Sequence, residues 1–281
     1  MTDYDVFVPP HVPLADAERL RVGYEVAARK YEELAGDLGD RVCAIHAAFS
    51  SEAGGRLNPA SPEPDVRAEA LAAWDEGLDV AAAARASLVV VHAAPQHWGG
   101  VRDVGRYELL VQAVRALGER AAERNLRVAV ENNRRYWGET PDDADPRDVD
   151  LDALDLYFAT FPEDWIRLAS DVDHPNVGLC LDTSHATTVA HEKPIGEERE
   201  QRLWDYLVAP EAVTHVHWSD NYLGTPQGRL DSHCAVGQGD LPKAFHARIV
   251  ELPATKTFEH PGMDRVEASM RYLQEQLRAG N

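Results

Sequence analysis

The chain has 281 residues, of which 44% are hydrophobic, so it can bury a large core and is not predicted to be disordered. Its 48 acidic and 28 basic residues leave a formal net charge of −20, which disfavours a nucleic-acid ligand because phosphate binding usually shows a basic surface. No apolar run reaches the roughly 18 residues of a membrane span, and residues 1–5 lack the layout of a signal peptide.

Short β-branched runs alternate with long helical stretches along the chain. Strands are predicted at residues 6–8, 42–49, 88–93, 127–131, 177–182, 213–218 and 255–259. Helices are predicted at residues 15–38, 65–84 and 104–124, and a polar insertion over residues 134–160 leads into further helix that ends near residue 170. Strands that alternate with helices predict a parallel sheet, and their continuous apolar character indicates that both faces are covered. We expect one α/β domain over residues 1–281.

Six side chains that can bind metals lie at or just past the C-terminal ends of the predicted strands. They are His46, His92, Glu131, Asp182, His217 and Glu259. Each is about one βα unit from the next, and in a (β/α)8 barrel the C-terminal strand ends converge on one active site. Three histidines and three carboxylates form a mixed nitrogen and oxygen ligand set that suits Zn²⁺, Mn²⁺ or Fe²⁺. The pattern predicts a metal centre at the mouth of a TIM-type barrel.

Several short motifs carry a family resemblance over residues 42–262. The most specific are Asp182-Thr183-x-His185-Ala186 and Asp231-x-His233 followed by Gly237-x-Gly239, and Glu131-Asn132, His217-Trp218 and Phe258-Glu259 accompany them. In this order they resemble the successive motifs of the xylose-isomerase-like TIM-barrel superfamily. That superfamily includes endonuclease IV, sugar epimerases of the tagatose type, hydroxypyruvate isomerase and inosose dehydratase.

The resemblance implies a set of metal ligands, each at a matching position of this chain. Glu131, Asp182, His217 and Glu259 correspond to the metal centre that the superfamily shares. His46 and His92 match a second metal position of endonuclease IV, in which the equivalent of Glu131 bridges both metals. His185, Asp231 and His233 match the third position of that enzyme. The expected cofactors are therefore up to three divalent ions, with zinc or manganese favoured.

The sequence departs from the family pattern in two places. The first strand of the family is missing, because residues 5–10 resemble the second strand, so only seven strands are predicted. Either the chain starts upstream of Met1, or a helix or a partner subunit covers the gap, and a homo-oligomer stays open. The tagatose-type epimerases also carry an arginine six residues after the metal-binding histidine, where this chain has Leu223. A close match to the ketose 3-epimerases is therefore not expected.

Two kinds of chemistry suit such a centre. In isomerisation or epimerisation of a sugar or sugar phosphate, a metal acidifies the proton next to a carbonyl, and Glu131 and Glu259 act as the two bases. In phosphodiester hydrolysis, as in an abasic-site endonuclease, metals activate water and neutralise the leaving oxygen. The complete ligand set favours the second reaction, whereas the acidic charge and the frequency of sugar chemistry in the superfamily favour the first. A dehydratase, or a metal-binding barrel without catalysis, is the remaining alternative.

Four residues are candidates for contact with substrate: Phe49, Arg134, His185 and His11. A small sugar is the expected partner, ahead of a nucleic acid, and no membrane partner is expected. Three cysteines are too few for a disulfide framework, which favours the reducing cytoplasm. Only four of the basic residues are lysines, and acidic surfaces that prefer arginine resemble those of salt-loving archaea, where high net charge maintains solubility.

Overall fold

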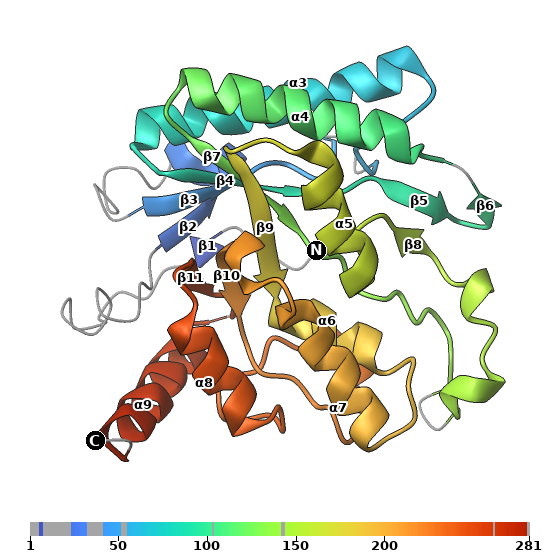
Figure 1. The fold of residues 1–281 in the computed structure, drawn as a ribbon, viewed down its shortest axis with the longest axis vertical. Helices are drawn as coiled ribbons and strands as arrows, with labels where there is room; N and C mark the ends of the chain where they lie inside the picture. The colour runs from blue at the N-terminus through green and yellow to red at the C-terminus, as the bar shows by residue number, and fades with distance from the viewer. Residues whose placement is uncertain are drawn as a thin grey trace.

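A nearly closed barrel of parallel strands is the centre of the fold (Figure 1). The structure is a computed structural model, and it describes residues 6–7, 24–32, 42–51, 55–102, 104–141, 144–260 and 262–279. In spatial order the seven parallel strands are β2 (Tyr24–Ala27), β3 (Val42–His46), β4 (Leu88–His92), β7 (Arg127–Glu131), β9 (Val177–Asp182), β10 (Val213–Trp218) and β11 (Thr255–Phe258). The short strand β1 (Val6–Phe7) pairs with β2 in the antiparallel direction. Within the described ranges no pairing joins β11 to β1.

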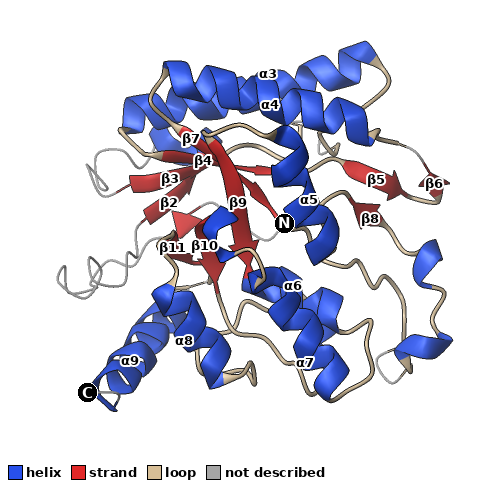
Figure 2. Ribbon diagram, in the orientation of Figure 1, coloured by secondary structure: helices blue, strands red, loops and turns tan. Residues whose placement is uncertain are grey.

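Helices cover the outside of the barrel (Figure 2). They are α3 (Pro64–Ala84), α4 (Tyr107–Glu123), α5 (Pro162–Val172), α6 (Thr183–Ala190), α7 (Glu197–Trp204), α8 (Lys243–Glu251) and α9 (Met263–Ala279), with short 3-10 turns between several of them. Helix α3 packs on β3 and β4, and α4 packs on β7 and β9. A second small sheet, made of β5 (Pro95–Trp98), β6 (Val101–Arg102) and β8 (Leu156–Tyr157), extends from the barrel beside β4.

Local sequence explains where the long helices lie. Helix α3 begins with Pro64, whose fixed φ suits the first helical turn, and it ends before Arg85, which adopts a left-handed φ of 55°. Its buried residues Trp74, Leu78 and Ala81 recur every three or four positions, so one stripe faces the strands. None of the described helices is both long and apolar enough to cross a membrane.

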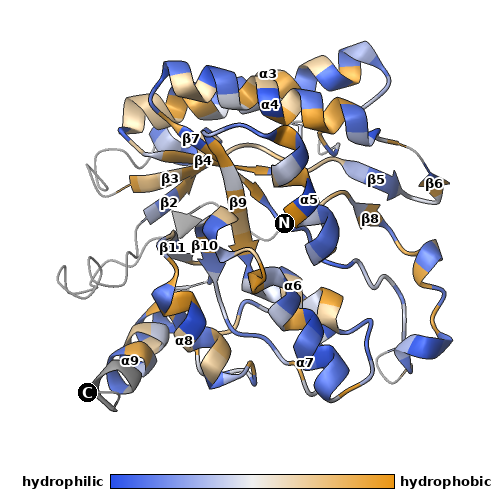
Figure 3. Cartoon of the chain, in the orientation of Figure 1, coloured by the Kyte–Doolittle hydropathy of each residue, from blue (hydrophilic) through white to orange (hydrophobic). Residues whose placement is uncertain are grey.

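Residues on the strands alternate between the inside of the barrel and the helices. The outer side chains belong to one large apolar core with the helices, as with Val89 and Val91 of β4. The inner side chains form a small separate cluster of Ala44, Leu88, Val90, Ala129 and Cys180. Figure 3 shows β3, β4, β7 and β9 as largely hydrophobic, whereas the helices carry hydrophobic and hydrophilic residues in alternation. Because side chains of a strand alternate with period two, the last inner positions of the strands point together into the mouth of the barrel.

The structure corrects the predicted start of the barrel. Residues 15–38 were expected to be helical, yet β2 (Tyr24–Ala27) is a strand, and it pairs in parallel with β3. The predicted strand at residues 6–8 is the antiparallel edge strand β1 and not the first parallel strand. Long stretches of Ala, Arg and Glu flank β2 and favour a helix locally, but the open edge of β3 stabilises the extended form. The expected number of seven parallel strands is confirmed, with β2 as the first of them.

Candidate metal centre

The six strand-end residues converge at the C-terminal mouth of the barrel. In the sheet register His92 lies opposite Glu131, and His217 lies opposite Asp182. His46 ends β3 and Glu259 directly follows β11. All six therefore occupy the last inner positions of their strands, as the spacing of the sequence predicts.

Four of these residues form a central group around one imidazole nitrogen. The Nδ1 atom of His217 lies 3.2 Å from Glu131 Oε1, 3.2 Å from Glu259 Oε2 and 3.9 Å from Asp182 Oδ2. Their ligand atoms all lie within 4.8 Å of one another. One nitrogen and three carboxylate oxygens at this separation match the donor set of a zinc or manganese ion.

A second group shares Glu131 with the first. Glu131 Oε2 lies 3.0 Å from His92 Nε2 and 3.3 Å from His46 Nε2, while its other oxygen faces His217. The carboxylate thus has one oxygen in each group. This is the bridging arrangement that the family resemblance implies.

A third group lies at the start of α6 and brings Asp182 to the expected residues His185, Asp231 and His233. Asp182, His185 and His233 present ligand atoms within 4.8 Å of one another. Asp231 also contacts both histidines, with Oδ2 lying 3.2 Å from His185 Nε2 and Oδ1 lying 2.9 Å from His233 Nε2. Asp182 caps α6 by accepting a hydrogen bond from the backbone N–H of His185, which places the His185 ring at the mouth. Asp182 therefore belongs to two groups, a role that the sequence did not indicate.

The electrostatics of the centre follow from many acids in a buried space. Burial raises the pKa of Asp182 well above its ordinary value, although His185 opposes the shift. Burial is the largest single influence on Glu259 and disfavours its ionised form. The charges of His233 and His217 and the hydrogen bond with His217 together outweigh burial and lower the pKa of Glu259 to about 2. Burial disfavours the charged His217 ring too, and the surrounding negative charges nevertheless raise the pKa of His217 well above its ordinary value. The clustered carboxylates at the mouth are therefore stabilised by positive charge, which bound protons or metal cations can supply.

One oxygen tests whether the residues fit a metal. Asp182 Oδ2 is buried and accepts no hydrogen bond within the part of the chain that the structure describes. An ionised oxygen in this state costs free energy, because nothing replaces the water that it lost. A divalent cation between Asp182, Glu131, His217 and Glu259 would satisfy it, and the mixed donor set suits such an ion. The residues present therefore fit a metal.

A buried acid beneath the centre was missed by the sequence analysis. Glu25 on β2 is fully buried, and its Oε2 lies 2.9 Å from His217 Nε2 and 2.9 Å from His215 Nε2. Burial opposes its ionisation, but the charge of His217 and the hydrogen bonds from both rings hold the pKa of Glu25 below its ordinary value. An ionised carboxylate only accepts hydrogen bonds, so His217 Nε2 carries the proton and Nδ1 faces the three carboxylates. The sequence signal that could have identified Glu25 is an acidic residue between the hydrophobic residues Tyr24 and Val26.

Three of the four expected substrate contacts lie beside the ligand groups. Phe49 is 38% exposed, and its ring centroid lies 5.0 Å from that of His92. Arg134 Nη1 lies 3.3 Å from Asp231 Oδ2, and its guanidinium carbon lies 4.6 Å from the centroid of the Tyr136 ring. His185 is in the third group, and His11 lies outside the described residues.

A parallel barrel with clustered ligands at its C-terminal mouth is the architecture of TIM-barrel proteins, which bind their ligands at that mouth. The chain belongs to the xylose isomerase-like TIM barrel family, whose model matches residues 5–276.

Individual relatives are distant. The chain is 24% identical over 202 residues to an uncharacterized protein of Methanocaldococcus jannaschii. The aligned region covers 70% of this chain and 56% of that protein. This chain is also 24% identical over 86 residues to a probable endonuclease 4 of Halothermothrix orenii. That aligned region covers 30% of this chain and 31% of the endonuclease. The matches thus span about half and about a third of the lengths of these relatives. Among solved structures, a D-tagatose 3-epimerase-like protein superposes with a TM-score of 0.65 at 19% identity, covering 91% of this chain and 88% of that chain.

Proposed function

We propose that this protein is a divalent-metal-dependent isomerase or epimerase that acts on a sugar or sugar phosphate. One observation carries the proposal: Glu131 from β7 and Glu259 after β11 each place an oxygen 3.2 Å from the same His217 nitrogen. Two carboxylates that approach one metal position from different strands can serve a substrate bound between them. The similarity of this fold to that of a D-tagatose 3-epimerase-like protein also supports an isomerase or epimerase function.

The chain would hold its principal metal through Glu131, Asp182, His217 and Glu259. When bound, the ion would polarise a carbonyl and the adjacent hydroxyl of the substrate. It would so acidify the C–H proton on the carbon that carries this hydroxyl. His46 and His92 with Glu131, and His185 and His233 with Asp182, provide sites for further ions.

The two glutamates differ in how readily they reach a substrate. The Glu259 side chain is 13% exposed, whereas the Glu131 side chain is 1% exposed. We therefore assign removal of the proton to Glu259, whose low pKa keeps it ionised. An isomerisation within one face needs only this base. An epimerisation also needs a second group that exchanges a proton on the opposite face, and Glu131 is the second carboxylate that faces the same metal position.

The second candidate is an endonuclease IV-like phosphodiesterase. It is favoured by the presence of all three ligand groups in the mouth and by the partial match to a probable endonuclease 4. The formal charge of −20 opposes it, because a strongly acidic protein repels the phosphate backbone of DNA.

A paired assay separates the two functions. Metal-loaded protein is incubated at molar salt in D₂O with ketoses and ketose phosphates, and in parallel with an abasic-site oligonucleotide. We expect deuterium at a sugar carbon, loss of this exchange in Glu259→Gln, and normal exchange in the matched surface variant Glu267→Gln. Cleavage of the oligonucleotide that needs metal and disappears in Glu259→Gln, without sugar exchange, would replace the first proposal by the second.

A further inference from the structure

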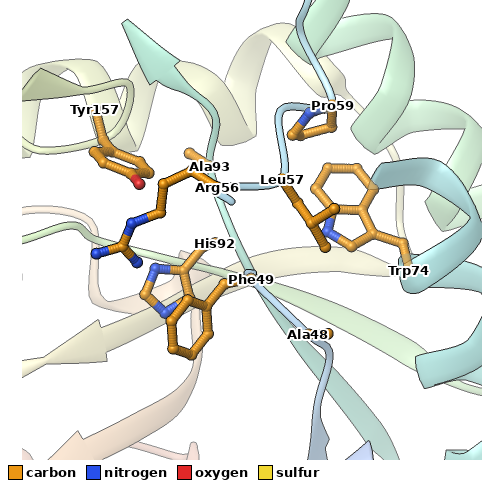
Figure 4. A pocket seen from close by; sticks show the side chains of 9 residues that line it. All are labelled: Ala48, Phe49, Arg56, Leu57, Pro59, Trp74, His92, Ala93 and Tyr157. Atoms are coloured by element: carbon orange, nitrogen blue, oxygen red, sulfur yellow. The ribbon is translucent and has the colours of Figure 1, made fainter. Parts of the chain in front are cut away.

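A pocket beside the metal centre joins a proposed metal ligand to an arginine that the function has not used. His92, Phe49, Arg56 and Tyr157 line it together with mostly apolar neighbours. Figure 4 shows the Arg56 guanidinium between Tyr157 and the paired rings of His92 and Phe49. A substrate bound at His92 therefore has a cationic group within the same pocket.

Arg56 is one of the described arginines that have no carboxylate partner. Arg120, Arg124 and Arg202 each bind a carboxylate. In the described part of the chain no carboxylate lies within salt-bridge distance of the Arg56 guanidinium, which instead stacks over the rings of Phe49, at 5.7 Å, and Trp98, at 5.2 Å. In so acidic a chain, a guanidinium that packs on aromatic rings and not on an acid is available to an anion.

The backbone holds Arg56 in this position. Ser50 and Arg56 form an antiparallel β-bridge in the loop after β3. On one side of this bridge the Ser51 N–H donates to the Gly55 carbonyl, and on the other the Leu57 N–H donates to the Phe49 carbonyl. Because this bridge ties Arg56 to the strand segment that carries Phe49, the backbone of Arg56 lies close to the mouth.

A second arginine approaches from the other side of the same aromatic group. Trp98 packs edge-on against Tyr136 and Tyr157, at centroid distances of 4.9 and 5.8 Å, and Arg134 lies over Tyr136. Burial raises the pKa of Tyr157, while the positive charges of Arg56 and Arg134 both oppose this rise. The positive charges of Arg56 and Arg134 therefore both act at the position of the Tyr157 hydroxyl.

The separation from the metal centre selects the kind of ligand. One ring, Phe49, lies between Arg56 and the centre, with its centroid 5.0 Å from the His92 ring and 5.9 Å from the His46 ring. This spacing suits the few carbon atoms that separate the carbonyl end of a sugar from a terminal phosphate. A planar guanidinium binds phosphate with two parallel hydrogen bonds, which a neutral sugar hydroxyl cannot match.

We propose that Arg56, with the ring edges of Trp98 and Tyr157, binds the phosphomonoester of a phosphorylated sugar whose carbonyl end lies at the metal centre. This inference rests on the proposed isomerase function and narrows its substrate to a sugar phosphate. A phosphodiester in DNA is the competing source of the same chemistry, and the acidic charge of the chain opposes it.

The first test compares substrates at constant ionic strength. Exchange in D₂O is measured with a ketose phosphate and with the same unphosphorylated ketose. We expect the lower KM for the phosphate, and Arg56→Gln should raise that KM about 10- to 100-fold while kcat and the KM for the free ketose change little. Arg271→Gln, on the exposed face of α9, is the matched control. Equal KM values for both sugars that Arg56→Gln leaves unchanged would overturn the phosphate site and leave the isomerase function intact.

A second measurement does not depend on turnover. Calorimetric titration with a sugar-alcohol phosphate, which has no carbonyl to react, should show binding that weakens about 10- to 100-fold in Arg56→Gln and less in Arg56→Lys. Binding of equal strength in the wild type and Arg56→Gln would overturn the site. Tighter Arg56-dependent binding of an abasic oligonucleotide than of the sugar-alcohol phosphate would overturn the choice of a phosphomonoester. Absence of exchange with every sugar would instead count against the isomerase function.

Discussion

Glu25 Oε2 lies 2.9 Å from His217 Nε2, so a fully buried carboxylate on the first parallel strand orients the only histidine of the central group. The hydrogen bond fixes the proton on Nε2 and leaves the Nδ1 lone pair for a metal. Carboxylate partners of this kind typically set the orientation and basicity of a ligating imidazole. His215 donates to the same oxygen, which keeps the carboxylate in place.

Replacement of Glu25 should therefore weaken metal binding without any direct contact to the metal. We expect Glu25→Gln to reduce the affinity of the central group for Zn²⁺ by roughly 10- to 100-fold. Competition with a chromogenic chelator measures the affinity, and nitrogen NMR of the metal-loaded protein reports the His217 tautomer. Glu32→Gln, at an exposed position, is the matched control. Unchanged affinity and tautomer in Glu25→Gln would show that His217 is oriented by other contacts.

Metal content is the most direct check on the three ligand groups. Protein that is purified without chelator and reloaded with Zn²⁺ or Mn²⁺ should carry two to three divalent ions per chain, because three groups share two bridging carboxylates. Removal of the ions should lower the melting temperature, since ligands that bind only the folded state stabilise it. Elemental analysis and calorimetry measure both effects. A single ion would restrict the site to the central group, and none after reloading would refute the assignment.

Glu131 is the residue on which two groups depend. We expect Glu131→Gln to lower turnover by at least about 100-fold, because the amide can neither bridge two cations nor accept a proton. Circular dichroism should show that the fold persists, and the metal content should fall. Glu139→Gln, eight positions on and exposed, should behave as the wild type. Full turnover in Glu131→Gln would place the chemistry elsewhere.

His191 should make stability depend on pH away from the metal groups. Burial and the charge of Arg199 lower the pKa of His191 from 6.5 to about 4, and its ring donates to the Tyr222 carbonyl. Between these pH values the unfolded chain binds a proton that the folded chain does not. The free energy of unfolding should therefore fall as the pH falls from about 6.5 to 4, by on the order of 2–3 kcal/mol from this residue. Urea unfolding of the wild type and His191→Gln should show curves that diverge over this range, and parallel curves would contradict the prediction.

The position of the strand-end ligands follows from local sequence. Val89, Val91 and their neighbours form short apolar strands, and the spacing of one βα unit brings His92 and Glu131 to adjacent strand ends in register. Side-chain alternation and the right-handed βα connection are local rules, so a single sequence suffices to predict them. For the same reason the family motifs can be recognised without coordinates.

Tertiary structure alone decided which segment begins the barrel and what lies around the mouth. Residues 24–27 have no strong local preference, and only the unpaired edge of β3 makes them a strand, which carries Glu25 beneath His217. Arg56, Trp98 and Tyr157 come from three distant segments and meet through loop closure and the side sheet. Contacts of this kind depend on long-range pairing, whose free energy is not encoded in any short stretch of residues.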